Sequence, residues 1–446
     1  MRTKKNEATI KKNHMDVLWH EYTDKKDLTP ITGASLSEKA SVIGRVGIMM
    51  LACGTGAWRV RSSMNELSEL MNVTCTVDIG LMSINYTCFD GNDSFSQSLC
   101  LTNTGVNTSQ LNRLEKLVSN FATDEIGQSC EKIHSRLDKI EKIHGLYSPV
   151  TLAVFAALAC GAFTFLLGGG IVEMLCAFAG AGIGNYIRCK LSKHHFTLFL
   201  NIAVSISAAC LMYAICLKAA EIFFHVPAVH EAGYICSMLF IIPGFPFITS
   251  GIDLAKLDLR SGLERLTYSI IIVLVATMFA WIMAMLLRLQ PQDFTSVNLS
   301  DVSRLVLRLI ASFCGVFGFS IMFNSSIPMA ATAALIGSVA NTLRLELVDF
   351  TGIPAVAASF IGSLTAGLLA SFIKKNNGYP RISLTVPSIV IMVPGLYLYR
   401  AFYNFGIMSL TEAVSWFSIA IMIIIALPLG LIFARILTDR TFRYCT

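Results

Sequence analysis

The sequence predicts a polytopic α-helical membrane protein with a soluble-type α+β domain at its N-terminal end. Only 14% of its 446 residues are charged, against about 25% in ordinary soluble proteins, and its mean hydropathy is +0.62. From Val150 onward, apolar blocks of roughly 17 to 24 residues recur, which is the length that a helix needs to cross about 30 Å of hydrocarbon. These observations exclude an ordinary soluble protein.

The N-terminal third of the chain has a different character. Residues 1–148 contain 17 basic and 17 acidic residues, so the whole formal charge of +6 comes from the apolar remainder. Residues 1–32 are polar and lysine-rich, and we expect them to be poorly ordered. No apolar stretch of the kind found in a cleaved secretory signal follows the first five residues, so we expect no such signal.

Residues 33–148 predict an α+β domain that ends in an amphipathic linker helix. Apolar residues at helical spacing begin near Ser35 or Ser37, which are candidate N-caps. The next segment is rich in residues that favour strands, and a polar turn at residues 90–93 divides it into a predicted hairpin. Another helix is expected to begin at Thr108 or Ser109. The amphipathic residues 129–149 are expected to lie along the membrane surface or to lead into the first span.

The apolar remainder predicts ten membrane spans, five in residues 149–290 and five in residues 305–437. Their expected bounds are Val150–Leu167, Ile171–Ile187, Phe196–Leu217, Tyr234–Ile252, Leu266–Leu289, Leu305–Phe323, Ile327–Leu343, Ile353–Ile373, Ile382–Tyr399 and Ala413–Ile436. With the N-terminus inside, about twelve basic residues fall in interior loops and the C-terminal tail, and four fall outside. Because interior loops are enriched in Lys and Arg, both termini are expected to be cytoplasmic.

The two groups of five spans contain a matching motif. "AGAGIGNYIRCKL" at residues 179–191 aligns with "LIGSVANTLRLEL" at residues 335–347. Asn185 thereby matches Asn341, Arg188 matches Arg344, and Glu173 matches Met329. Since five is an odd number, two copies of a five-span unit must enter the membrane from opposite sides. The sequence therefore predicts two inverted repeats, an architecture common among secondary transporters.

Each predicted repeat also contains a Pro-Gly pair inside an apolar span, two spans after the matching motif. The pairs are Pro243-Gly244 and Pro394-Gly395. Proline lacks the amide hydrogen and interrupts a helix, and broken helices at matching positions of two repeats mark binding sites in transporters of this architecture. The alternative is that each pair only bends a helix for packing.

Four stretches of the chain carry a resemblance to a known family. They are "LACGTGAWRVRSSMNELSELMNV", "PGFPFITSGIDLAKLDLRSGLERL", "AATAALIGSVANTLR" and "VPSIVIMVPGLYLYRAF". The matching positions are Gly54, Gly56, Ala57, Arg59, Pro243, Gly244, Asp253, Leu254, Ser261, Gly262, Arg265, Pro387, Pro394, Gly395, Tyr399 and Arg400. Over nearly its whole length the chain resembles the threonine/serine exporter family, in a form that fuses two halves found as separate chains in some relatives. Thr249 departs from the family pattern, because the resemblance leads us to expect asparagine at this position.

The resemblance implies export of threonine and serine driven by the proton motive force. Such a zwitterion needs donors for its carboxylate, an acceptor for its ammonium group and a polar partner for its hydroxyl. Amides at broken helix ends attract carboxylates, and carbonyls freed before each proline can accept from an ammonium group. The substrate-binding candidates are Pro243, Gly244, Pro394, Gly395, Asn185, Asn341 and Arg400. For the two asparagines the alternative is interhelical packing, and for Arg400 it is snorkelling to the interface.

Two carboxylates are candidates for proton coupling or gating. Glu173 lies inside a predicted span, where ionisable residues are costly and generally functional; the alternative is a position at the outer interface. Asp253 lies at the cytoplasmic end of the first broken helix, near Lys256 and Arg265. There the alternative is a structural ion pair or cap.

Other function classes remain open as alternatives. A channel would use the two breaks as filter elements, and a membrane-bound enzyme would use the α+β domain, although that domain has only scattered Ser, Asp and His residues. No cofactor or metal is expected, since His134 and His144 lie ten residues apart on nearly opposed faces of a helix. The expected partners are threonine, serine, protons and the lipid bilayer of the plasma membrane, without nucleic acid. A homo-oligomer is left open.

Overall fold

The computed structural model describes residues 17–23, 29–91, 93–143, 145–226, 228–291, 293–294 and 299–444. The chain forms two units, residues 1–144 and 145–446. Most of the segment that we expect to be poorly ordered lies outside the described residues, and so does His144.

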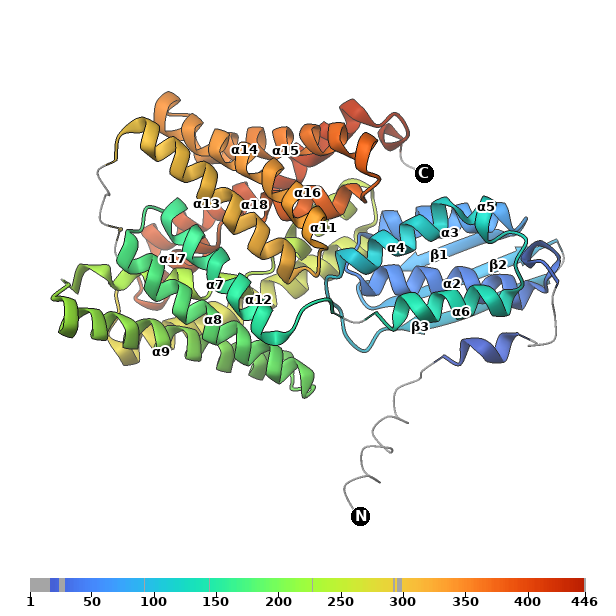
Figure 1. Ribbon diagram of the computed structural model, residues 1–446, viewed down its shortest axis with the longest axis horizontal. Helices are drawn as coiled ribbons and strands as arrows, with labels where there is room; N and C mark the ends of the chain where they lie inside the picture. The colour runs from blue at the N-terminus through green and yellow to red at the C-terminus, as the bar shows by residue number, and fades with distance from the viewer. Residues whose placement is uncertain are drawn as a thin grey trace, which may run out of the picture. The chain divides into compact units, whose positions relative to one another are not determined.

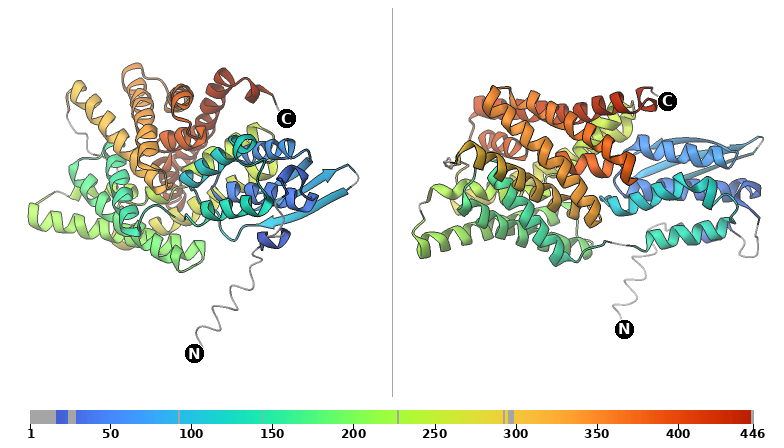
Figure 2. Two further views of the ribbon diagram at one scale, coloured as in Figure 1. Left: turned by 45° about the vertical axis from the view of Figure 1, so that its right-hand side comes forward. Right: turned by 45° about the horizontal axis from the view of Figure 1, so that its top comes forward.

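Unit 1 contains a three-stranded antiparallel sheet in the order β1-β2-β3, with helices on one face (Figures 1 and 2). Its elements are η1 (Trp19–Tyr22), η2 (Ile31–Gly33), α2 (Leu36–Ala52), α3 (Ala57–Leu70), β1 (Thr74–Ile79), β2 (Ser83–Asp90), β3 (Asp93–Cys100), α4 (Thr108–Ser119), α5 (Phe121–Asp124) and α6 (Cys130–Glu141). Alternate residues of β2 (Ile84, Tyr86 and Cys88) are buried, as expected for a sheet with one covered face. Strands β2 and β3 pair across the polar turn that the sequence predicts.

Helix ends in unit 1 differ in detail from the sequence-based expectation. Ser35 is the N-cap of α2 and forms a capping box with Glu38. For α4, the expectation of Thr108 or Ser109 is wrong, because Asn107 is the N-cap and its side chain accepts from the Gln110 amide at 3.0 Å. Asparagine is among the best N-caps.

The amphipathic helix α6 is shorter than the linker that the sequence predicts. Its apolar face, with Ile133 and Leu137, is buried inside unit 1, where α6 packs against α2 and α4. That face is therefore covered by the unit's own core and is not free to lie on a membrane surface.

All regular elements in the described part of unit 2 are helices (Figure 1). Its elements are α7 (Pro149–Leu166), α8 (Ile171–Lys193), α9 (Leu198–Phe224), η3 (Ala228–Gly233), α10 (Tyr234–Ser237), η4 (Leu239–Ile241), α11 (Gly244–Ala255), α12 (Leu259–Leu287), α13 (Asp301–Met322), α14 (Ile327–Thr351), α15 (Ala355–Asn377), α16 (Arg381–Val390), α17 (Gly395–Gly406), α18 (Leu410–Thr438) and η5 (Thr441–Arg443).

Among the described residues, six helices are long and apolar enough to cross a membrane, namely α7, α9, α12, α13, α18 and residues 355–373 of α15. Two bent pairs pass the same test as broken spans: residues 234–241 with α11, bent by 53°, and α16 with α17, bent by 49°. These findings establish a multi-pass membrane protein with six to eight candidate spans. Two further predicted spans form α8 and α14, which are 23 and 25 residues long and are not among the helices that pass this test.

The backbone of unit 2 repeats its turns at nearly constant spacing. Residues with left-handed φ angles end or connect helices in four pairs, 151 to 157 positions apart: Gly168 with Asn324, His195 with Gly352, His225 with Gly378, and Leu257 with Met408. Helices α12 and α18 both have 29 residues, and α11 and α17 both have 12. The spacing is 157 at His195 and 153 at His225, before the bent pairs, and 151 at Leu257, after them.

Small residues let the helices of unit 2 approach closely. A Cβ atom added to Gly180 would lie 2.7 Å from the Ala209 carbonyl oxygen of α9, and one added to Gly318 would lie 2.5 Å from the Phe155 oxygen of α7. Such contacts are typical of helix packing in membranes, where dispersion forces replace the hydrophobic effect. They fix the frame that holds the two bent pairs.

Candidate substrate cavity and the paired helix breaks

The two helix breaks have the same local geometry. Pro243 has φ −81° and ψ 60°, and Pro394 has φ −81° and ψ 54°. In each break the following glycine amide donates to the carbonyl two residues earlier at 2.8 Å, to Ile242 in the first and to Val393 in the second. These two carbonyls, which we expected to be freed before each proline, therefore each accept one hydrogen bond.

The two breaks pack against each other reciprocally. A Cβ atom on Gly244 would lie 2.5 Å from Cγ2 of Val390, just before the second break. A Cβ atom on Gly395 would lie 2.7 Å from Cδ2 of Leu239, just before the first break. Val390 and Leu239 are themselves 151 positions apart, as the two glycines are. At both positions an added Cβ would therefore force a side chain of the opposite break to shift.

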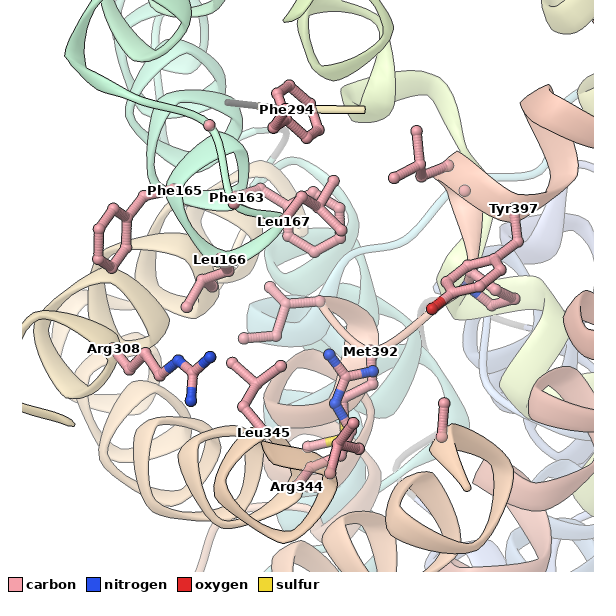
Figure 3. Close-up of a pocket in the computed structure, with 18 of the residues that line it drawn as sticks. Phe163, Phe165, Leu166, Leu167, Phe294, Arg308, Arg344, Leu345, Met392 and Tyr397 are labelled. Atoms are coloured by element: carbon pink, nitrogen blue, oxygen red, sulfur yellow. The ribbon is translucent and has the colours of Figure 1, made fainter. Parts of the chain in front are cut away.

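A cavity of about 580 Å³ borders the second break. Its wall includes Pro394, Gly395 and Arg400 of the predicted site, together with the C-terminal end of α7 and residues of α13 and α14. Figure 3 shows the guanidinium groups of Arg308 and Arg344 at this wall, with the Tyr397 hydroxyl directed toward Arg344. The other predicted site residues (Pro243, Gly244, Asn185, Asn341, Glu173 and Asp253) are not part of this wall.

Two arginines at the cavity wall have carboxylate partners. Arg308 donates from Nη1 to Glu346 at 2.9 Å and from Nη2 to Asp349 at 2.6 Å. Arg400 lies 2.8 Å from Asp293, measured between Nη2 and Oδ1, and its guanidinium carbon is 5.0 Å from the centre of the Trp416 ring. Arg400 is 9% exposed, whereas its partner Asp293 has a 91% exposed side chain.

Arg344 differs from these two arginines. In the described part of the chain its side chain has no ion pair, and its Nε is buried without a hydrogen-bond partner. An unpaired guanidinium within a membrane protein is costly. The repeat motif predicts the position of Arg344 but gives no sign that a cavity opens beside it.

The two matched asparagines join neighbouring helices. Asn185 of α8 donates from Nδ2 to the Leu152 carbonyl of α7 at 2.9 Å, and Asn341 of α14 donates to the Ser312 hydroxyl of α13 at 2.9 Å. Both side chains are fully buried. The geometry matches the packing alternative, since interhelical hydrogen bonds of this kind contribute about 0.6 kcal/mol.

Glu173 is 1% exposed and lies at the N-terminal end of α8. Its Oε2 accepts from the Gly170 amide at 3.0 Å, and its Oε1 lies 2.7 Å from Nδ1 of His230. Tyr213 donates its hydroxyl to the His230 carbonyl at 2.6 Å. Sequence reasoning missed His230, because it lies in the η3 segment 57 residues from its partner and no periodic pattern points to it.

Asp253 forms a fully buried cluster with Ser261 and Arg265. Its Oδ2 accepts from the Ser261 hydroxyl at 3.0 Å and lies 3.3 Å from Nε of Arg265. Arg265 Nε also donates to the Ser261 hydroxyl at 3.2 Å. The cluster joins α11 to α12, which agrees with the structural alternative for Asp253.

Two family models match the chain. One, described as "Putative threonine/serine exporter", matches residues 41–287, and the other, "Threonine/Serine exporter, ThrE", matches residues 308–437. The chain belongs to the threonine/serine exporter family. Both models describe exporters and not enzymes, in agreement with the expectation from the sequence.

More distant relatives of this exporter-family chain are also found. The chain is 26% identical over 153 residues to the "Probable succinate transporter subunit YjjP" of Escherichia coli K12 and to the protein of the same name from Klebsiella aerogenes. The matched region is 34% of this chain and 57% of each relative. No solved structure matches.

Proposed function

We propose that the protein exports threonine and serine across the plasma membrane by alternating access, driven by the proton motive force. The observation that carries the proposal is the reciprocal packing of the two breaks, in which Gly244 lies against Val390 and Gly395 lies against Leu239. Breaks that meet in this way place two interruptions of the helical backbone at one point. Sites of that kind are used by secondary transporters built from inverted repeats.

Ten spans in two inverted repeats are part of this proposal. If α8 and α14 cross the membrane as the second and seventh spans, each copy has five spans and the copies have opposite orientations. The four pairs of left-handed turn residues, together with the equal lengths of α11 and α17 and of α12 and α18, support two copies of one backbone unit. On this topology both termini and unit 1 are cytoplasmic, and unit 1 has a regulatory or gating role.

The cavity suits a small carboxylate-bearing substrate. Its volume of about 580 Å³ falls within the ~300–1,000 Å³ of small-molecule sites. The first turn of α17 lies at its wall, where amide groups and the positive end of the helix dipole attract a carboxylate. Arg400 adds a cation at the same wall. Replacement of Pro394 by alanine or glycine, or of Gly395 by alanine, is therefore expected to change transport and not only folding.

Proton coupling is assigned to Glu173 and His230. A carboxylate that is 1% exposed and 2.7 Å from an imidazole nitrogen can exchange a proton with its partner without leaving the protein. In this proposal Asp253 has no coupling role and only stabilises the cluster with Arg265. The proposal thus keeps one of the two coupling candidates and adds a residue from η3.

The test uses inside-out vesicles, in which export appears as uptake of labelled threonine. We expect saturable uptake that concentrates threonine and collapses when a protonophore is added. Vesicles without the protein are the control. Passive threonine flux that does not depend on the proton gradient would favour the channel alternative.

A second candidate substrate is a dicarboxylate. The observation that favours it is the set of arginines at the cavity wall, Arg304, Arg308, Arg344 and Arg400, against two aspartates, Asp293 and Asp349. The names of the two relatives refer to succinate transport. Labelled succinate in the same vesicles decides between the candidates. If the vesicles take up succinate but do not take up threonine, the dicarboxylate replaces the amino acids as the proposed substrate.

A further inference from the structure

We propose that Arg344 binds the carboxylate of the substrate in the cavity, and that Arg188 makes the matching contact when the opposite side opens. This inference rests on the proposed function and adds the residue that recognises the substrate. Neither arginine was among the site candidates that the sequence suggests.

The first step is the chemistry of Arg344. Its guanidinium faces the cavity beside Tyr397 (Figure 3), and in the described part of the chain no carboxylate pairs with it. Arg308 and Arg400 already have carboxylate partners, and Arg304 donates to the Leu299 carbonyl at 3.4 Å. Since guanidinium groups bind carboxylates in a two-pronged geometry, an incoming carboxylate would supply the missing partner of Arg344.

The second step is the place of Arg344 relative to the break. A Cβ atom on Gly362 would lie 3.2 Å from Cβ of Arg344 and 3.3 Å from the sulfur of Met392, so Arg344 and the residue two before Pro394 flank one glycine. A carboxylate held by Arg344 would therefore lie next to the bend between α16 and α17. Binding there can bias the bend, because a ligand shifts an equilibrium when it contacts the two states differently.

The third step is the repeat mate. Arg188 also has no ion pair among the described residues, and its guanidinium carbon lies 5.8 Å from the centre of the Phe240 ring, three residues before the first break. Each repeat thus places an arginine without a carboxylate partner near its own break. In an inverted repeat the two arginines face opposite sides of the membrane, as alternating access requires.

The experiment measures ligand-induced thermal stabilisation of the purified full-length protein. The probes are threonine, threoninamide (which lacks the carboxylate) and succinate. We expect threonine or succinate, but not threoninamide, to raise the Tm of the wild type. Arg344→Ala should lose this shift and weaken binding roughly 10- to 100-fold, as for the loss of a hydrogen-bonded charge. Arg260→Ala, which removes an exposed arginine of α12, should keep it.

Arg344→Lys keeps the charge but not the two-pronged geometry, and it is the second variant if Arg344→Ala does not fold. We expect it to bind more weakly than the wild type but more tightly than Arg344→Ala. The inference is overturned if Arg344→Ala or Arg344→Lys binds as the wild type does, if threoninamide stabilises equally, or if no carboxylate binds. Carboxylate binding through Arg344 without threonine transport in vesicles would instead refute the proposed function and leave this inference standing.

Discussion

The hydroxyl oxygens of Tyr234 and Tyr399 lie 2.6 Å apart, and both side chains are fully buried. Tyr234 belongs to the short helix before the first break, and Tyr399 belongs to the helix after the second. Their rings meet edge to face at 5.7 Å. The two bent pairs are therefore joined by a polar contact as well as by the packing of Gly244 and Gly395.

This contact predicts a coupled pair of substitutions. Tyr234→Phe or Tyr399→Phe alone leaves a buried hydroxyl without its partner, at a cost of about 1–3 kcal/mol. The double variant removes both hydroxyls and should cost less than the sum of the single variants. Thermal unfolding of the four proteins in detergent measures the coupling. Additive losses would show that the hydroxyls do not stabilise each other.

The pairing of Asp253 with Arg265 predicts a severe loss of stability when one of the two side chains is removed. Asp253→Ala removes the carboxylate that lies 3.3 Å from the buried guanidinium of Arg265, which costs about 3–5 kcal/mol. Asp253→Ala combined with Arg265→Met should recover part of the lost stability, because both charges of the buried pair are then removed. Yield and Tm of the folded protein give the comparison. If the double variant is no more stable than Asp253→Ala, the charge pair is not the source of the loss.

The proton-coupling proposal predicts different results for two substitutions of Glu173. Glu173→Gln keeps the hydrogen-bonding shape but cannot take up a proton, so threonine uptake should no longer respond to the proton gradient. Glu173→Asp should retain part of the response. His230→Ala is expected to act like Glu173→Gln. Proton-coupled uptake by Glu173→Gln at the wild-type level would remove Glu173 from the mechanism.

In unit 1, His20 predicts a pH-dependent contact of residues 17–23. Its Nδ1 lies 2.9 Å from Glu131 and its Nε2 lies 3.2 Å from Asp138, so an imidazole with protons on both nitrogens fits the site best. The hydrogen bond to Glu131 is the main cause that raises the pKa of His20 above 6.5, and burial works against it.

Because the pKa of His20 is raised in the folded protein, the stability that it contributes is fully present below pH 6.5. That stability is lost as the pH rises through the folded-state pKa. Histidine hydrogen exchange followed by mass spectrometry reports the pKa of His20 in the full chain, and Glu131→Gln should lower it. His134 is the internal control, since burial lowers its pKa to about 3 and it should stay neutral between about pH 5 and 8. A pKa of His20 that Glu131→Gln leaves unchanged would contradict the contact.

Sequence reasoning reached the features that local patterns encode. Proline and glycine interrupt helices through their own backbone chemistry. Pro243-Gly244 and Pro394-Gly395 could therefore be located as breaks and aligned through the motif around Asn185. Contacts between distant segments have no such signal. His230 contacts Glu173 only because the folded chain places η3 next to the start of α8. Arg344 lies at a cavity only because α7, α14 and the second break leave space between them.

The central claim is that the two breaks act as a pair. Gly244→Ala and Gly395→Ala each add one methyl group, which would lie 2.5 Å from Val390 and 2.7 Å from Leu239 unless the breaks separate. We therefore expect both variants to reduce threonine uptake into inside-out vesicles to a similar extent. Gly127→Ala, in a turn of unit 1 where an added Cβ meets no atom within 4 Å, is the control and should keep wild-type uptake. Wild-type uptake by Gly244→Ala together with a loss in Gly395→Ala, or the reverse, would contradict the claim.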